Sequence, residues 1–223
     1  MTGVQTCALP ILPAPPAYSE DTASPFFKDA MEVYDTSRAL TDDQKIIARF
    51  WSDDAMLSYT PPGHWIAILD QVATERALPL DAHVDALARI GVAMADAFIG
   101  VWRAKYQYDT IRPISYIRKV IDPKWETLLN TPPFPEYPSG HSTQSAAAAE
   151  VLTALFGDNY AFTDESPAPD GIPQRSFASF RAAADEAAIS RLYGGIHFRP
   201  AIEQGQTQGR CIAAFAIALK TRG

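Results

Sequence analysis

Apolar residues recur at three- and four-residue spacing along almost the whole chain, and this helical periodicity limits the possible fold more than any other feature. No segment alternates apolar and polar residues over the length of a strand. Helices are expected at residues 26–34, 41–51, 64–77, 81–108, a short stretch after Pro123, 139–156, 176–193 and 200–220. Residues 157–174 are expected to be a surface loop. The predicted fold class is therefore all-α, a helical bundle.

The composition narrows the range of partners. The 223 residues are 47% hydrophobic and carry a formal net charge of −7 at pH 7. A chain of this length can bury the core of one domain, or at most of two. Nucleic acid is not an expected partner, because phosphate backbones are bound by clustered Lys and Arg in excess. No run of eighteen apolar residues occurs, so no membrane span is expected.

The N-terminal segment is treated separately from the fold. It begins MTGVQTCALPI, which resembles a translated sequencing adapter more closely than a secretion signal. The prediction is a non-native leader at 1–12, a Pro-rich lead-in at 13–25 and a single helical catalytic domain at 26–223, as the C-terminal part of a longer protein. With the native start missing, a periplasmic or secreted location stays open. Setting the leader aside removes Cys7, so Cys211 is expected to form no intrachain disulfide.

Three positive side chains occupy positions where the helical pattern calls for core residues. The core stripe expected in the 81–108 helix is Val84, Leu87, Gly91, Met94, Phe98 and Val101. Lys105 is the next position on that stripe, and Arg112 follows two helical turns later. In the 176–193 helix the expected stripe is Phe177, Phe180, Ala184 and Ala187. Arg191 is the next position there, so three cations are predicted to point inward.

A buried cation needs a negative partner, since an unpaired buried charge is strongly destabilising. One explanation is a structural ion pair for each cation, with Asp53, Asp54, Asp96 and Glu150 as candidates. The other is a single oxyanion held by all three cations, for which the planar donor fork of arginine is suited. Ion pairing is the simpler explanation for one inward cation, but three together favour the anion.

The tetrad Pro-Ser-Gly-His at 138–141 stands where an alanine-rich helix is expected to begin. Backbone N–H groups at a helix start lack intrahelical acceptors and favour an anion. Ser139 can add a hydroxyl donor, Gly140 lets an anion approach the main chain, and His141 can exchange a proton near neutral pH. An ordinary N-cap with an exposed histidine explains the tetrad equally well when it is taken alone.

A second histidine strengthens the case for an anion site. Gly194 and Gly195 end the helix that carries Arg191, and His197 precedes Pro200 near the start of the last helix. A structural role for His197 is the alternative. His64 and His83 have no comparable neighbours in the sequence, and structural roles are predicted for both.

Three segments carry a family resemblance: KYQYDTIRP at 105–113, PSGH at 138–141 and SRLYGGIH at 190–197. Their order and spacing resemble the three-part motif of the vanadium haloperoxidase and type 2 phosphatidic acid phosphatase superfamily. The wording FPEYPSGHST and SRLYGGIHFRPAIE is similar to the soluble bacterial haloperoxidase-like branch, and the resemblance extends over most of the chain after Ser24. It implies a helical bundle of the vanadium haloperoxidase or acid phosphatase type.

The resemblance also implies a role for each motif position. The implied vanadate- or phosphate-binding residues are Lys105, Arg112, Ser139, Gly140, Arg191 and His197. Of these, His197 would be bonded to the vanadium or, with phosphate, would be the nucleophile. Lys105 would polarise bound peroxide, and His141 would be the acid–base group. The chemistry of these side chains is consistent with the implied roles, because cations and N–H donors stabilise five-coordinate vanadate and the transition state of phosphoryl transfer alike.

One position departs from the family pattern. An acid four residues after the last histidine usually orients the imidazole, but Ala201 stands there. Glu203 or a backbone carbonyl is the expected substitute. The missing acid weighs against the phosphatase, because nucleophilic attack needs a basic imidazole more than coordination does.

The function implied is a vanadate-dependent haloperoxidase that oxidises a halide, expected to be bromide, with hydrogen peroxide. The alternatives are an acid phosphatase that acts on phosphomonoesters through phosphohistidine, and a non-catalytic helical anion-binding module. Trp65, Trp102 and Tyr108 are the expected neighbours of a halide. A homodimer is one way in which the chain would cover exposed apolar faces.

Overall fold

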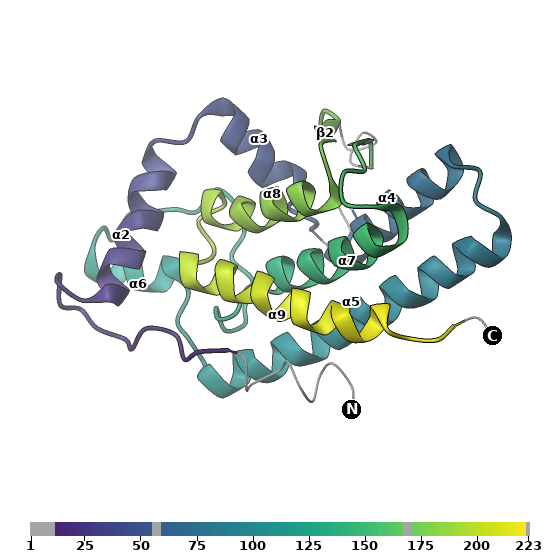
Figure 1. Cartoon of the computed structure of the whole chain (residues 1–223). Helices are drawn as coiled ribbons and strands as arrows, with labels where there is room; N and C mark the ends of the chain where they lie inside the picture. The colour runs from purple at the N-terminus through teal and green to yellow at the C-terminus, as the bar shows by residue number, and fades with distance from the viewer. Residues whose placement is uncertain (1–11, 55–58, 167–170, 222–223) are drawn as a thin grey trace.

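The computed structural model describes residues 12–54, 59–166 and 171–221, and in them the all-α prediction is confirmed (Figure 1). The helices are α2 (Pro25–Arg38), α3 (Asp42–Phe50), α4 (Pro61–Glu75), α5 (Leu80–Tyr108), α6 (Pro113–Val120), α7 (Gly140–Phe156), α8 (Phe180–Tyr193) and α9 (Arg199–Ile217). Two three-residue strands, β1 (Phe162–Asp164) and β2 (Arg175–Phe177), pair antiparallel. None of the described helices is long and apolar enough to cross a membrane.

Side-chain caps explain where several helices begin. The hydroxyls of Ser24, Thr41, Thr60, Ser139 and Ser179 each accept a hydrogen bond from a backbone N–H of the first turn. Thr41 and Gln44 form the capping box that their spacing predicts.

Several of the expected boundaries are wrong, among them the start of α4, which is Pro61 and not residue 64. The short helix after Pro123 is absent, and α6 instead begins at Pro113, because proline lacks only an N–H that the first helical turn leaves unpaired. Residues 175–177 form β2 rather than the first turn of α8, which starts at its cap Ser179. The partner strand lies in the segment expected to be a loop. A three-residue strand is too short for its alternation to be visible in sequence.

Helix α7 is the centre of the bundle, and α4, α5, α8 and α9 pack around it (Figure 1). The buried alanines at 146–149 leave it no exposed face along this stretch, since small side chains let neighbouring helices approach on every side. The closest approach is made by α9, whose Gly205 and Gly209 lie against the backbone of α7. The main core surrounds α7, which holds the first residues of this helix in a fixed position.

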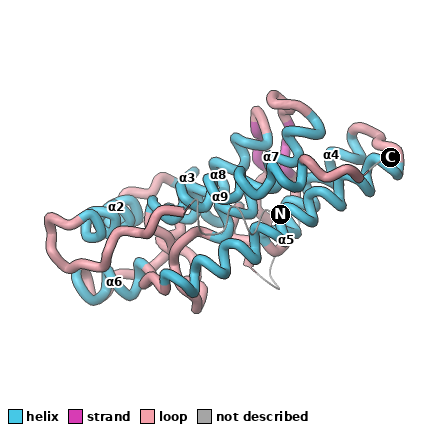
Figure 2. Tube along the Cα trace, turned by 60° about the horizontal axis from the view of Figure 1, so that its bottom comes forward, coloured by secondary structure: helices cyan, strands magenta, loops and turns pink. Residues whose placement is uncertain are grey.

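A second cluster of buried residues lies where α2 and α6 meet α8 and α9. The tube view shows α2 and α6 gathered at one end of the molecule, with α4 toward the other (Figure 2). The Pro-rich lead-in runs along this region, where Tyr137 donates a hydrogen bond to the carbonyl of Pro13 at 2.6 Å. Leu12, assigned from sequence to the leader, is buried. Residues 1–11 lie outside the described part of the chain.

The core stripe predicted for α5 is only partly correct. Met94 and Val101 are buried as expected, but Val84 is 55% exposed and Phe98 is 42% exposed. The buried face of α5 consists mainly of small residues, namely Ala86, Ala93, Ala97, Gly100 and Ala104, with Ile90, Met94 and Val101 among them. Helix packing at close range therefore selects a face that a count of large apolar residues misses. Lys105 is nevertheless fully buried.

Cys211 is disulfide-bonded in the structure, so the expectation that it forms no intrachain disulfide is wrong. Cys7 itself lies outside the described residues.

Replacing Gly209 by Ala is expected to destabilise the protein by about 1–3 kcal/mol, because overpacking forces the backbone apart. A Cβ there would lie 2.2 Å from the carbonyl oxygen of Thr143. Gly91→Ala is the matched control, since a Cβ at Gly91 meets nothing within 4 Å. It should stabilise the helix by about 0.5–1 kcal/mol. Urea unfolding measures both free energies; equal effects of the two changes would contradict the close α7–α9 contact.

Candidate active site

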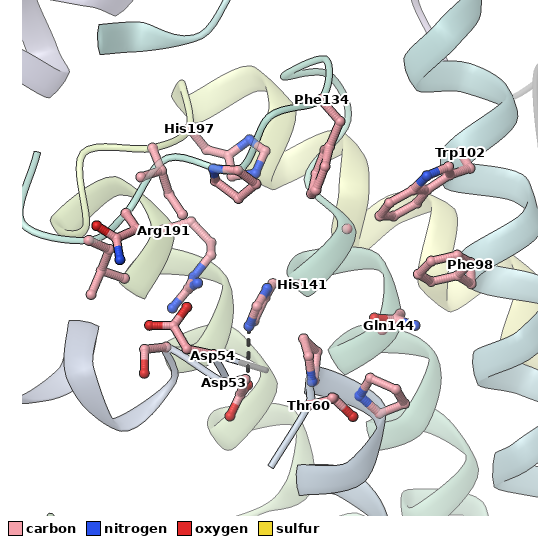
Figure 3. Close-up of a pocket in the computed structure, with 18 residues that line it drawn as sticks. Asp53, Asp54, Thr60, Phe98, Trp102, Phe134, His141, Gln144, Arg191 and His197 are labelled. Atoms are coloured by element: carbon pink, nitrogen blue, oxygen red, sulfur yellow. Dashed lines mark hydrogen bonds and ion pairs between the residues drawn. The ribbon is translucent and has the colours of Figure 1, made fainter. Parts of the chain in front are cut away.

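A cavity of about 490 Å³ opens beside the first turn of α7 (Figure 3). Phe98, Trp102 and Phe134 lie along one wall, and the opposite wall carries Arg191 with Asp53 and Asp54. Of the predicted anion-site residues, those that line the cavity are Gly140, His141, Arg191 and His197. Those that lie buried outside its lining are Lys105, Arg112 and Ser139. The cavity thus combines an apolar wall with a charged one.

Lys105 is held by carbonyl groups. Its Nζ donates to the carbonyls of Pro135 and Glu136, both at 2.9 Å, and lies 5.3 Å from the ring centre of Phe134. Burial, together with the charge of Arg112, lowers the pKa of Lys105 well below its usual value. An ammonium group has three donors, so one remains beyond these two carbonyl contacts.

Arg112 has an unused donor. Its Nε donates to the carbonyl of Phe134 at 2.8 Å, and its Nη1 donates to the carbonyl of Ile196 at 2.9 Å. The same Nη1 lies 3.1 Å from Nε2 of His197. Nη2 is buried and has no hydrogen-bond partner among the residues that the structure describes. Burial lowers the pKa of Arg112 to about 10, which still leaves the guanidinium charged at neutral pH.

Arg191 is buried at the end of α8, where it donates to the Ser190 hydroxyl and to the carbonyl of Trp51. Burial lowers its pKa to about 10, while the charges of Asp53 and Asp54 oppose that shift. Within the described residues no ion pair joins Lys105, Arg112 or Arg191 to a carboxylate. The predicted ion-pair explanation is therefore not what the structure shows.

The carboxylates named as candidate partners are engaged elsewhere or lie apart from the cations. Asp53 pairs with two histidines, and Glu150 pairs with Arg181. Asp54 lines the cavity and acts on Arg191 only through its charge. The pKa of Asp96 is raised by burial, and no cation contributes to that shift.

His197 is oriented by an acid that the sequence reasoning missed. Its Nδ1 lies 2.7 Å from Oε1 of Glu136, which also accepts the backbone N–H of Phe198 at 3.0 Å. Nη1 of Arg112 can only donate and faces Nε2, so the lone pair is on Nε2 and Nδ1 carries the proton that Oε1 accepts. Burial and the charge of Arg112 hold the pKa of His197 well below its usual value, so the ring is neutral at pH 7.

The expectation that Glu203 or a backbone carbonyl replaces the missing acid is wrong. Glu203 is exposed on α9, whereas Glu136 is 1% exposed and lies in the Pro-rich loop before α7. The only sequence signal was the position of this acid within FPEYPSGH, between prolines and next to the tetrad. Nothing in the spacing from residue 197 pointed to it, since the two residues lie 61 positions apart.

Ser139 caps α7, which is the role that the alternative explanation of the tetrad gave it. Its Oγ accepts from the backbone N–H of Ser142 at 3.3 Å and from the Ser142 hydroxyl at 2.9 Å, which leaves its own hydroxyl hydrogen to donate. Gly140 borders the cavity, and a Cβ there would come within 3.4 Å of Trp102. The N–H groups of this first turn are donors with no intrahelical acceptor.

His141 is the first residue of a hydrogen-bonded network of titratable side chains. Nε2 of His141 lies 3.1 Å from Oδ2 of Asp53, and Oδ1 of Asp53 lies 2.8 Å from Nδ1 of His64. Nε2 of His64 in turn lies 2.8 Å from Oδ2 of Asp164. Both ring nitrogens of His64 face carboxylates, so this ring is an imidazolium. His64 is thus buried in a structural role, as predicted, but it also reaches His141 through Asp53.

These contacts shift the pKa values of the side chains in this network. Burial alone would lower the pKa of His64, but hydrogen bonds with Asp164 and Asp53 raise it to about 9. Burial would raise the pKa of Asp53, but its hydrogen bonds with His141 and His64 lower it to about 2. Burial and the charge of Arg191 lower the pKa of His141 to about 4, so it is neutral at pH 7. His83 instead forms a more exposed pair with Asp70.

The sequence of this chain matches a family model and a known enzyme. The family model described as the VCPO second helical-bundle domain matches residues 85–222. Vanadium chloroperoxidase of Curvularia inaequalis is 34% identical over 100 residues, which are 38% of this chain and 16% of that protein.

Solved structures match more of the chain. The structure described as the first bacterial vanadium-dependent iodoperoxidase superposes with a TM-score of 0.90 at 46% identity, covering 95% of this chain and 53% of that one. A holo-type bacterial vanadium-dependent chloroperoxidase shares the fold, with a TM-score of 0.73 at 19% identity over 86% of this chain and 47% of that one. The chain therefore spans about half the length of these solved relatives.

The buried His64 imidazolium predicts a pH dependence of stability. Its folded pKa of about 9 lies above the ordinary histidine pKa of 6.5, so its contribution to stability is complete below pH 6.5 and is lost as the pH rises through 9. The loss is on the order of 3 kcal/mol. Denaturant unfolding from pH 6 to 9.5 should show this decline in the wild type and a weaker decline in His64→Gln. His83→Gln is the control and should follow the wild type; parallel curves for all three proteins would contradict a charged His64.

Proposed function

Because the chain belongs to the vanadium-dependent haloperoxidase family, we propose that it binds vanadate in the cavity beside His197 and oxidises a halide with hydrogen peroxide. The observation that carries the proposal is the buried Nη2 of Arg112, which has no partner in the described part of the chain, while the charges of Arg112, Lys105 and Arg191 all act on His197. A buried donor without an acceptor is destabilising, and an oxyanion supplies the acceptor.

The residues present fit vanadate. Lys105, Arg112 and Arg191 would hold its oxygens, with hydrogen bonds from the Ser139 hydroxyl and the Gly140 N–H. Nε2 of His197 would be the ligand to vanadium, since the proton on Nδ1 leaves the lone pair on Nε2, where it accepts from Nη1 of Arg112 in this structure. Bound vanadate supplies a Lewis-acidic centre that activates hydrogen peroxide toward attack by a halide.

His141 would be the acid–base group. Its Nε2–H faces Asp53, so its Nδ1 carries the lone pair and can accept a proton. The carboxylate of Asp53 stabilises the imidazolium that forms. This division of roles leaves Lys105 and the two arginines to neutralise negative charge on the bound oxygens.

The halide proposed is iodide, in place of the bromide expected from sequence. The relative that is 46% identical over most of this chain is described as an iodoperoxidase. The apolar wall of Phe98, Trp102 and Phe134 suits the largest and least strongly hydrated of the common halides. Of the three aromatic neighbours expected from sequence, only Trp102 lines the cavity. Trp65 is in the core, where it donates to Ser145, and the Tyr108 hydroxyl donates to the carbonyl of Leu12.

The presence of Glu136 beside His197 strengthens the phosphatase alternative. The objection to it was an imidazole without an orienting acid, and the contact of 2.7 Å between Glu136 and His197 supplies one. A phosphatase would place Nε2 of His197 for attack on phosphorus, and vanadate would then inhibit the protein instead of activating it.

Three further points are proposals as well. They are a catalytic domain at 26–223 that is part of a longer protein, a periplasmic or secreted location, and a homodimer. The apolar residues exposed on α5, among them Leu80, Val84 and Ile99, are what motivates the dimer.

The test is an assay of purified protein with orthovanadate and hydrogen peroxide against iodide, bromide and chloride, with a phosphomonoester in parallel. Iodide oxidation should be fastest and should require vanadate. His141→Ala should lower kcat by roughly 100-fold or more, His197→Ala should abolish the dependence on vanadate, and the surface control His83→Ala should change neither. Phosphoester hydrolysis that vanadate inhibits would favour the phosphatase, and no turnover on any substrate would favour a binding module.

A further inference from the structure

We propose that Glu136 is the positioning residue of the site: it replaces, from the loop before α7, the acid that the family pattern places at position 201, and it fixes His197 and Lys105 relative to each other. The inference rests on the proposed function only in using vanadate as the probe. It concerns a residue that holds a ligand in place and does not itself touch the reacting atoms.

The main chain of Glu136 is fixed on both sides. Its N–H donates to the carbonyl of Thr110 at 2.9 Å, and its own carbonyl accepts from Nζ of Lys105 at 2.9 Å. The residue therefore joins the segment after α5 to the loop that leads into α7. A backbone held in this way gives the side chain a defined starting point.

The carboxylate of Glu136 reaches the third motif from that starting point. Oε1 accepts from Nδ1 of His197 and from the backbone N–H of Phe198, at 2.7 and 3.0 Å. Two donors from consecutive residues hold one oxygen, so both the imidazole and the peptide that carries it are oriented. Through its carbonyl and its carboxylate, one residue positions the ammonium of Lys105 and the imidazole of His197 together.

The surroundings of Ala201 explain why the acid can stand at 136 and not at 201. Ala201 is buried, and its carbonyl accepts the N–H of Ser139 at 3.0 Å. It borders a cavity of about 10 Å³ together with Glu136, Asp29 and Thr110. That volume is close to the minimum for one water molecule, so a carboxylate at 201 has no room while Glu136 is present. A second acid would also add a negative charge beside Glu136.

The consequence is a fixed tautomer of His197. With Glu136 in place the proton stays on Nδ1, and the lone pair of Nε2 is available for a ligand. Without the carboxylate, the proton can move to Nε2 and block that lone pair. Loss of Glu136 should therefore act on anion binding through the tautomer, and not only through stability.

The experiment measures the tautomer and the affinity separately. Ring ¹⁵N chemical shifts report which nitrogen of His197 is protonated, and the chain has only four histidines to assign. Vanadate binding is measured by calorimetric titration of orthovanadate. Glu136→Ala should convert His197 to a mixture that includes the Nε2–H form and should weaken vanadate binding roughly 10–100-fold. Glu136→Gln should keep the Nδ1–H form, because its amide oxygen can accept, and should show a smaller loss.

Two controls separate positioning from stability. Glu203→Gln removes the acid that lies nearest in sequence to position 201 and should leave both readouts unchanged. Ile90→Ala removes buried apolar volume in α5 away from the site, so it destabilises the fold without touching His197. A loss of affinity in Glu136→Ala no larger than in Ile90→Ala, with the tautomer unchanged, would overturn the proposal.

A rescue variant tests the exchange of positions. Adding Ala201→Asp to Glu136→Ala should restore the Nδ1–H form and recover most of the affinity, since the new acid occupies the space that Glu136 leaves. If this double variant does not fold, the comparison of the Ala and Gln variants decides.

The outcome for the proposed function is separate from the outcome for Glu136. A tautomer that responds to Glu136→Ala in a protein that binds no vanadate supports the positioning role and rejects the proposed function. If the protein is a vanadate-dependent haloperoxidase, but Glu136→Ala changes neither the tautomer of His197 nor the affinity for vanadate, only the positioning role is rejected.

Discussion

The burial of three cations without carboxylate partners is the constraint on which the rest of this structure depends. Lys105, Arg112 and Arg191 are all nearly inaccessible, and burial lowers the pKa of each. Removing such charges from water costs several kcal/mol apiece unless other groups compensate. The chain compensates with carbonyl oxygens that accept hydrogen bonds from the cations, and with the nearby charges of Glu136, Asp53 and Asp54, none of which forms an ion pair with them among the described residues.

The fold provides these carbonyls at the ends of its helices. Residues 134–136 supply acceptors to Lys105 and Arg112 from the loop before α7, and Ile196 supplies another from the link between α8 and α9. Carbonyl dipoles leave the net positive charge in place, so the site retains its attraction for an anion. The alanine-rich α7 contributes by letting α5, which carries Lys105, and α8, which carries Arg191, pack closely against it.

Helical periodicity and the order of the motifs predicted much of this from sequence. The bundle, the cap at Thr41, the start of α7 and the inward direction of Lys105 and Arg191 followed from local spacing, because such features depend on residues within one or two turns. The identity of the anion-site residues followed from resemblance, and their roles stay proposals.

Contacts between distant segments could not be predicted in this way. Glu136 meets His197 across 61 residues, and Asp164 meets His64 across 100. No local pattern marks either pair. The face of α5 that packs on α7 was misjudged for a related reason: close packing favours small residues, whereas a search for a core favours large ones. The hairpin of β1 and β2 was missed although it carries Asp164 to His64.

The most direct test of the central claim is a crystal structure of the protein with orthovanadate, in which the anomalous signal of vanadium locates the anion. We expect one anion in the cavity, bonded to Nε2 of His197. Nη2 of Arg112 should donate to an oxygen of this anion, and Arg191 should lie on the side of the anion opposite Arg112. An empty cavity, with each of the three cations paired to its own carboxylate, would contradict it.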